Sequence, residues 1–281
     1  MNTRLLVLLA ACAVMGQAQS CGRECLRGLL DTYLLGMTRH DASKLNVTPS
    51  VKFTENGAVM KLGEGLWRTA GPVTYKLYAL DPEGSAAAVE AVVKENGALT
   101  TFLLRIKVAG KAISEAETIV CRKGQYDPSA PQKLTAAPAL FLQMVAKPER
   151  MSRKDLAAIA DAYFTAIQTE GTPQYKPVPL AEGMNRFENG EQTTNVPVFG
   201  MPAASASEQL EKGFFKGLGV SKRRFPVVDV EYGIVLGIGL MSVQGFGNIL
   251  FGEMFKMTGG KIRQIQAVLV NHPKTAPTGW N

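Results

Sequence analysis

Histidine and cysteine are scarce in this chain, with 2 histidines and 4 cysteines among 281 residues. The histidines, His40 and His272, lie far from the cysteines in sequence, so a structural zinc cluster is not expected. The sequence also lacks a glycine-rich phosphate loop, a dinucleotide fingerprint and a nucleophile elbow. We therefore expect no metal and no cofactor.

Long basic runs are missing as well. The longest is Lys222-Arg223-Arg224, aromatic residues do not alternate with it, and the net charge is only +7. Scattered cations usually form a solvated surface, so nucleic acid is not an expected partner. With 46% hydrophobic residues, the chain can bury a large core, and its length is near the size at which one domain usually becomes two.

The N-terminal segment, residues 1–20, carries one charge at Arg4, an apolar run over residues 5–14 and small residues at Gly16 and Ala18. This pattern is typical of a secretory signal peptide, and the run is too short to span a bilayer. A buried N-terminal helix is the alternative. The sequence predicts an exported protein, periplasmic or extracellular, with no membrane span.

Cys21, Cys25 and Cys121 remain after the predicted cleavage. In an oxidising compartment we expect one disulfide and one free thiol, and the sequence leaves the pairing open. Cys21 and Cys25 can pair only if Cys21 lies outside helical geometry. Lipidation of Cys21 is a weaker alternative, because no bulky apolar residue stands three places before it.

The chain repeats itself after about 130 residues. Two apolar stripes with helical spacing predict amphipathic helices, and Asp31-x-Tyr33 in the first matches Asp161-x-Tyr163 in the second. Ser152 with Asp155 forms a capping-box start for the second helix. Glu-Asn-Gly then occurs in both copies, at residues 55–57 and 188–190.

Each copy also ends in the same way. Residues 102–120 and 253–270 both show a strand, a glycine-lysine turn and a second strand, which predicts a β-hairpin. The segment 126–150 between the copies is rich in proline and alanine and has no strand pattern. We expect an α+β fold of two tandem domains, 21–125 and 151–281, joined by this linker.

Several motifs carry a resemblance to known families. They are CxxxCL at 21–26, YLLGMTRHD at 33–41, FTENG at 53–57, GEGLWRTA at 63–70, RFENGEQTT at 186–194, RRFPVVDVEYG at 223–233, GGKIRQIQAV at 259–268 and PTGW at 277–280. They resemble a family of secreted bacterial and fungal proteins, the domain of unknown function 8021 family. The order of elements resembles the cone fold of nuclear transport factor 2 and SnoaL-like proteins. The resemblance implies two cone-like domains, each an amphipathic N-terminal helix packed on a curved, mostly antiparallel sheet, and it implies no particular reaction.

Cone folds enclose an apolar pocket, and a few polar side chains in it decide the chemistry. In the first copy, Glu115 and Glu117 stand two apart on one strand and so share a face, where two carboxylates could divide acid and base roles. The second copy has Gln264 and Gln266 there. We therefore expect any catalysis in residues 22–125. An outer, solvated face is the alternative for both glutamates.

Further candidates surround this pair. His40, at a helix end, and Tyr33, on the apolar stripe, are two further candidate catalytic residues. The candidate binding residues are Trp67, Arg68, Glu55, Arg186, Glu188, Asp229 and Glu231. Each has a structural alternative, such as core packing for the tyrosine or turn stabilisation for the two Glu-Asn-Gly glutamates.

Three classes of function remain open. The first is an enzyme of cofactorless acid-base chemistry, such as a lyase, isomerase, dehydratase or hydrolase, acting on a small, partly apolar molecule. The second is a protein that binds such a molecule without turnover. The third is a structural pseudo-dimer, and a homo-oligomer is left open.

Overall fold

The computed structural model describes residues 21–243 and 247–280, so the predicted signal peptide lies outside the described residues. The first helix, α1 (Arg23–Thr38), buries an apolar face that includes Leu26 and Leu30. Cys21 precedes the helix and forms a disulfide with Cys25, while Cys121 is free and buried. One disulfide and one free thiol were predicted, and the structure confirms both. None of the helices in these ranges is long and apolar enough to cross a bilayer.

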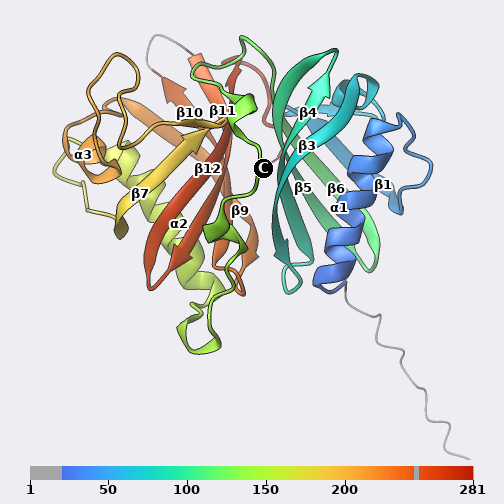
Figure 1. The fold of residues 1–281 in the computed structure, drawn as a ribbon, viewed down its shortest axis with the longest axis horizontal. Coiled ribbons are helices and arrows are strands. Elements are labelled where there is room, and N and C mark those ends of the chain that lie inside the picture. Colours follow the sequence, from blue (N-terminus) through green and yellow to red (C-terminus); the bar gives the residue numbers. More distant parts are fainter. Residues whose placement is uncertain (1–20, 244–246, 281) are drawn as a thin grey trace, which may run out of the picture.

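The first half of the chain forms a six-stranded sheet (Figure 1). Its strands are β1 (Val47–Glu55), β2 (Ala58–Met60), β3 (Ala70–Asp81), β4 (Ala86–Glu95), β5 (Ala98–Ala109) and β6 (Ala112–Cys121). Their order is β2-β1-β6-β5-β4-β3, with only the β1 to β6 pairing parallel among them. A short 3-10 helix, η1 (Gly65–Arg68), precedes β3.

The second half repeats this plan. After α2 (Arg153–Thr169) come β7 (Leu180–Glu188), β8 (Glu191–Gln192), α3 (Ala206–Glu211), β9 (Leu218–Asp229), β10 (Ile234–Val243), β11 (Gly247–Thr258) and β12 (Lys261–His272). The order β8-β7-β12-β11-β10-β9 matches the first sheet, and β7 is again parallel to β12. The connection between the halves holds three 3-10 helices, η2 (Pro131–Lys133), η3 (Ala139–Leu142) and η4 (Lys147–Glu149).

The two Glu-Asn-Gly segments are the tight turns between β1 and β2 and between β7 and β8. Asn56 and Asn189 both have positive φ, as their following glycines do, which this hairpin geometry requires. Each asparagine side chain bonds both backbone groups of one residue on the last strand, Val120 for Asn56 and Leu269 for Asn189. The repeated motif therefore fixes the first strand of each sheet against the last.

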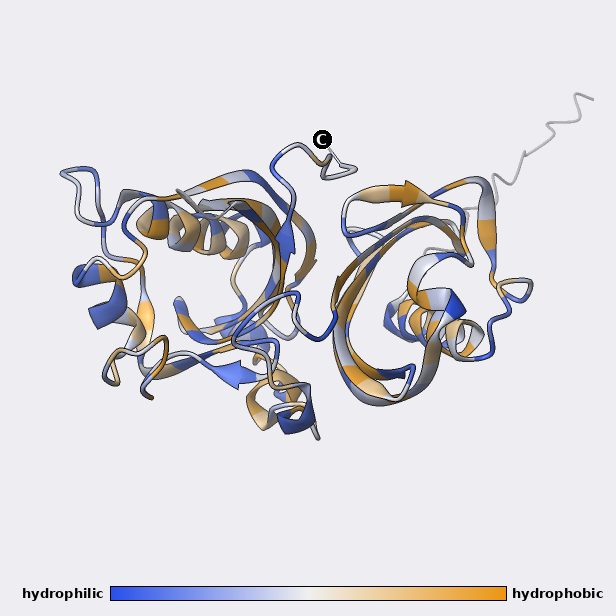
Figure 2. Ribbon diagram, turned by 90° about the horizontal axis from the view of Figure 1, so that it is seen from above, coloured by the Kyte–Doolittle hydropathy of each residue, from blue (hydrophilic) through white to orange (hydrophobic). Residues whose placement is uncertain are grey.

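The two curved sheets pack back to back, and each wraps around its own helix (Figure 2). Alternate residues of each strand point to opposite faces. One face of the first sheet joins α1 in a core with Leu30, and one face of the second joins α2 in a core with Phe164. The opposite faces meet in a third core that includes Leu103 and Met254.

Reciprocal ion pairs connect the halves. Arg23 at the start of α1 contacts Asp229 at the end of β9 with a shortest distance of 2.8 Å, and Arg153 at the start of α2 contacts Asp81 at the end of β3. Asp229 also accepts a hydrogen bond from the Leu80 amide, and Asp81 accepts one from Val228. Both aspartates are 1% exposed. The halves are therefore related by an approximate two-fold symmetry that extends to single hydrogen bonds.

Candidate functional site

The interior of the second half contains a cavity of about 320 Å³, lined by α2, the inner face of the sheet, the linker and the segment before β9. Its apolar and aromatic lining residues are Tyr126, Tyr163, Ile167, Phe199, Met201, Phe214, Phe215, Leu218, Met241, Ile249 and Leu269. Phe199 and Met201 are 49% and 40% exposed, which places them at the opening. Three ionisable side chains, Arg186, Glu188 and Glu253, line the buried end, and Lys216 lies on the exposed side.

Arg186 is held by four hydrogen bonds although it is only 2% exposed. Its Nε donates to Glu188 (2.9 Å) and to the Thr193 hydroxyl (3.0 Å). Its terminal nitrogens donate to the Tyr163 hydroxyl (2.9 Å) and to the Gln209 side-chain oxygen (2.8 Å). Partners from α2, α3 and the β8 region thus hold the guanidinium in one position.

Glu188 balances this cation. One oxygen accepts from Arg186 and Thr193, and the other accepts from the Tyr126 hydroxyl at 3.0 Å. Tyr126 belongs to the linker, so the connection between the halves completes the wall of the cavity. A buried charge is tolerated where it is paired and hydrogen-bonded in this way.

Glu253 is the third ionisable group. It lies on β11 between Phe251 and Phe255, which pack in the interior core, so the period of two places Glu253 on the same face. It is 3% exposed, and its Oε2 has no hydrogen-bond partner. Burial raises the pKa of Glu253 to about 8. The side chain is therefore a neutral carboxylic acid at pH 7, with a hydrogen to donate.

At the equivalent places the first half has larger side chains in place of Gly237 and Ala267, and apolar side chains in place of Glu253 and Arg186. Glu253 pairs across the sheet with Gly237 and Ala267, whereas its counterpart Leu104 pairs with Val89 and Thr118. The counterpart of Arg186 is Phe53, which is 2% exposed in the first core. The substitution of small and polar residues makes the interior of the second half the more open of the two.

Tyr33 and Trp67 pack together inside the first half. The Trp67 indole nitrogen donates to the Tyr33 hydroxyl at 2.8 Å, and their ring centroids are 4.8 Å apart. Both side chains are 1% exposed. The Tyr33 oxygen thus satisfies the indole N–H, and this pair fills the core at the place where the second half has Tyr163 bonded to Arg186.

Glu115 and Glu117 share a face, as predicted, and that face is turned toward the second half. Both contact Arg105, and Glu117 also accepts a hydrogen bond from Arg224 of β9 at 2.6 Å. Glu117 is 2% exposed. Its two arginine partners come from different sheets, so the structure gives Glu117 a place in the contact between the halves.

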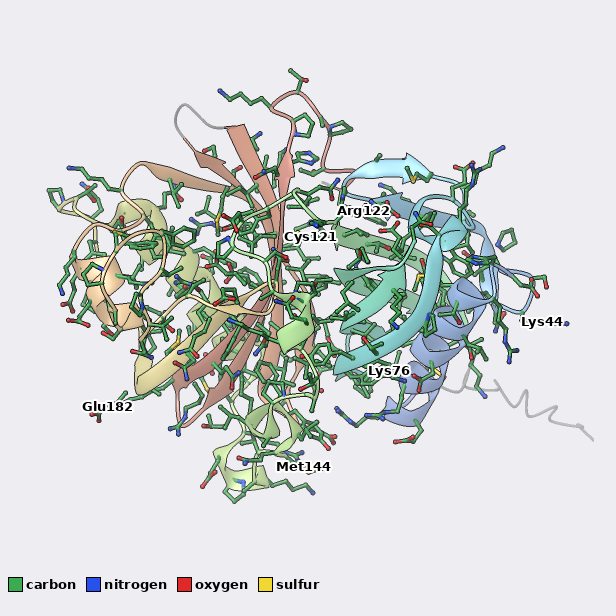
Figure 3. The ribbon with its side chains drawn as sticks, turned by 45° about the horizontal axis from the view of Figure 1, so that its top comes forward. Lys44, Lys76, Cys121, Arg122, Met144 and Glu182 are labelled. Atoms are coloured by element: carbon green, nitrogen blue, oxygen red, sulfur yellow. A yellow bond between two sulfur atoms is a disulfide. The ribbon has the colours of Figure 1, made fainter. Side chains whose placement is uncertain are left out.

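The remaining first-half candidates lie apart from one another. His40 is exposed, and its Nδ1 is 2.6 Å from the Trp67 carbonyl oxygen. Arg68 is exposed and pairs with Glu64. Glu55 is buried and accepts from the Leu66 amide (2.6 Å) and from Arg122 (2.9 Å; Arg122 is labelled in Figure 3), which fits the structural alternative. The catalytic role predicted for residues 22–125 stays a prediction.

The second-half candidates separate into two places. Arg186 and Glu188 line the cavity, whereas Asp229 and Glu231 contact Arg23 at the boundary between the halves. Sequence reasoning missed Glu253 and Tyr126. The alternation of Phe251, Glu253 and Phe255 is a signal that could have revealed the first, because it sets a carboxyl group on an apolar face.

Among residues 21–243 and 247–280, no group of three or more histidine, cysteine, aspartate or glutamate side chains is placed to hold a metal ion. The cavity instead combines an apolar opening, one internal ion pair and one neutral acid. Such a site can bind a partly apolar molecule, hydrogen-bond it and exchange a proton with it.

Residues 149–269 match the model of a domain of unknown function, DUF8021. Solved structures with partial likeness include a protein of unknown function with a cystatin-like fold from Methylobium petroleophilum PM1. It is 14% identical, the match covers 40% of this chain and 85% of that chain, and the TM-score is 0.34. An NTF2-like protein of unknown function from Shewanella baltica OS155 has 14% identity, coverage of 36% and 94%, and a TM-score of 0.27. A de novo designed NTF2-fold protein is 16% identical, the match covers 37% of this chain and 91% of that chain, and the TM-score is 0.29. A search of curated proteins found no match.

Proposed function

We propose that the protein binds a small, largely apolar molecule in the cavity of its second half. The proposal includes two cone-like domains, 21–125 and 151–281, joined by residues 126–150, in a protein exported after removal of residues 1–20. The disulfide between Cys21 and Cys25 supports an oxidising compartment.

The observation that carries the proposal is the unequal interior of the two halves. A duplicated fold that filled the second interior as it fills the first would gain packing, because cavities cost stability. The second half instead retains about 320 Å³ beside Arg186, Glu188 and Glu253. Ligand pockets typically have this composition, an apolar lining with few polar groups at fixed positions.

Acid-base catalysis in the same cavity is the second candidate function. It is favoured by Glu253, because a carboxylic acid with a pKa of about 8 can donate and recover a proton near neutral pH. Glu188, in the same wall, is a hydrogen-bonded carboxylate. A turnover assay that finds no rate lost in Glu253→Gln would remove this candidate and leave binding.

Native mass spectrometry of protein purified from its own host tests the binding proposal. We expect a retained ligand mass that disappears in Ile249→Trp, because the larger ring fills the cavity that Ile249 lines. Val59→Trp, at a residue 67% exposed on β2, is the matched control and should retain the mass. A mass kept by Ile249→Trp would place the ligand elsewhere and refute the proposal.

A further inference from the structure

We propose that the ligand of this cavity is an uncharged molecule with an apolar body and a hydrogen-bond acceptor, such as a carbonyl oxygen, at one end, and that Glu253 donates the hydrogen bond that recognises this acceptor. The inference rests on the proposed function and adds the chemical class of the ligand. Its geometric basis is an unpartnered oxygen on a fully buried side chain that lines the cavity.

The charges at the buried end of the cavity are already balanced. Arg186 and Glu188 form an ion pair at 2.9 Å, and both side chains are nearly inaccessible to solvent. A ligand carboxylate placed there would meet the negative charge of Glu188 without a free cation to offset it. The remaining cation of the lining, Lys216, is exposed and lies on the solvent side. An uncharged ligand is therefore favoured at depth.

A buried polar atom without a partner costs free energy, and a ligand that supplies the partner recovers it. Glu253 has such an atom, and its cross-strand neighbours Gly237 and Ala267 are small. The neutral acid is a donor, so the complementary ligand group is an acceptor. Aromatic and aliphatic side chains toward the opening, among them Phe214 and Leu218, fit an apolar body.

The charged and titratable groups that face Glu253 are Arg186 and Glu188 from β7, Tyr163 from α2 and Tyr126 from the linker. Burial raises the pKa of Tyr163 to about 12 and also raises that of Tyr126, so neither tyrosine ionises near pH 8. Loss of the Glu253 proton then adds a negative charge beside Glu188 and removes the donor. Binding of an uncharged acceptor should weaken as pH rises through the pKa of about 8.

Three probes of similar size separate the ligand classes: acetophenone, benzoate and ethylbenzene. We expect acetophenone to bind about tenfold more tightly than ethylbenzene at pH 6.5, from one additional hydrogen bond, and benzoate not to bind measurably. Acetophenone affinity should fall roughly fivefold by pH 9, because only about a tenth of the acid is then protonated and the ionised form should bind acetophenone about as weakly as ethylbenzene. Ethylbenzene affinity should not change with pH. Calorimetry or ligand-observed NMR measures both quantities.

Two variants isolate Glu253. Glu253→Gln keeps a neutral donor and should bind acetophenone with no dependence on pH. Glu253→Leu introduces the residue that the first half has at the equivalent position, Leu104, and should lose the preference for acetophenone over ethylbenzene. Glu90→Gln is the matched control: Glu90 is another buried glutamate, 1% exposed with a pKa of about 8, and it lies on the first sheet outside this cavity, so the pH profile should be unchanged.

The outcomes distinguish the two proposals. Binding of ethylbenzene and acetophenone with equal affinity would leave the pocket in place and overturn the inference. Tightest binding of benzoate would do the same, as would an unchanged pH profile in Glu253→Gln. Absence of binding by all three probes, or binding unaffected by Ile249→Trp, would overturn the proposed function itself.

Discussion

Replacing Asp229 with alanine should lower the free energy of unfolding by about 3 kcal/mol, because it removes one partner of a buried ion pair. Asp229 is 1% exposed and accepts two hydrogen bonds from Arg23, one from the Leu80 amide (3.0 Å) and one from the Tyr232 amide (3.2 Å). The substitution leaves the guanidinium and both amides without this acceptor. The loss is placed at the lower end of the range for buried pairs because the Arg23 side chain is 23% exposed and water can reach it.

Urea unfolding followed by tryptophan fluorescence is the appropriate assay. The protein has 2 tryptophans: Trp67 lies in the first core, and Trp280 packs against first-half residues Lys52 and Arg105. Trp67 therefore reports on the first half. Trp280 is a second-half residue that also lies near Arg224, so it reports on the contact between the halves, whereas Asp229 belongs to the second half. If the halves unfold together, the Asp229→Ala midpoint should shift by the same amount in fluorescence and in circular dichroism.

The two-fold arrangement supplies an internal repeat of this experiment. Asp81→Ala removes the reciprocal pair with Arg153 and should cost about as much. Lys212→Ala is the control, because the pair of Lys212 with Glu208 is exposed and should contribute at most about 0.5 kcal/mol. A loss below about 1 kcal/mol in both aspartate variants, or a shift seen by one probe alone, would refute the reasoning that these pairs join the halves into one cooperative unit.

Three further predictions concern groups outside the cavity. Glu117→Gln should lower the free energy of unfolding by about 2 kcal/mol, since Arg105 and Arg224 lose a shared carboxylate. It should leave ligand affinity unchanged, and an affinity loss in a calorimetric titration would show that Glu117 contributes to ligand binding. The exported protein should titrate with no thiol when folded and one when unfolded, because Cys121 is 2% exposed and the other two cysteines are bonded; three thiols in denaturant would contradict the disulfide. Burial raises the pKa of Glu90 from 4.5 to about 8, so the folded state holds a proton that the unfolded state releases, and stability falls between these pH values by at most about 1.4 kcal/mol per pH unit. Glu90→Gln should remove that part of the slope in urea titrations at several pH values, and an unaltered slope would show that Glu90 is already ionised when folded.

Much of the fold could be predicted because its signals are local. Helical stripes give α1 and α2, a capping serine gives the start of α2, and two Glu-Asn-Gly turns give the matching hairpins. The repeated order of these signals predicts the duplication without any knowledge of contacts. Packing of the sheets back to back has no local signal, because it depends on which apolar face of each sheet meets the other half.

The site was harder to predict for the same physical reason. A spacing of two residues shows that Glu115 and Glu117 share a face, but it does not show whether that face lines a pocket or meets a partner sheet. The ion pair of Glu117 with Arg224 shows that this face meets the second sheet, and Arg224 comes from the other half of the chain. Glu253 had a local signal in the strand alternation, whereas the linker residue Tyr126 had none, since its hydroxyl reaches Glu188 only after the linker folds across the second half.

A methyl NMR titration with acetophenone tests the central claim most directly. The account predicts shifts for the methyl groups of Ile167, Ile249 and Leu269, which line the second-half cavity. It predicts none for Leu30 and Ile106, which pack in the first-half core. Shifts confined to the first half, or no shifts at a saturating concentration, would contradict the claim that the second half holds the ligand.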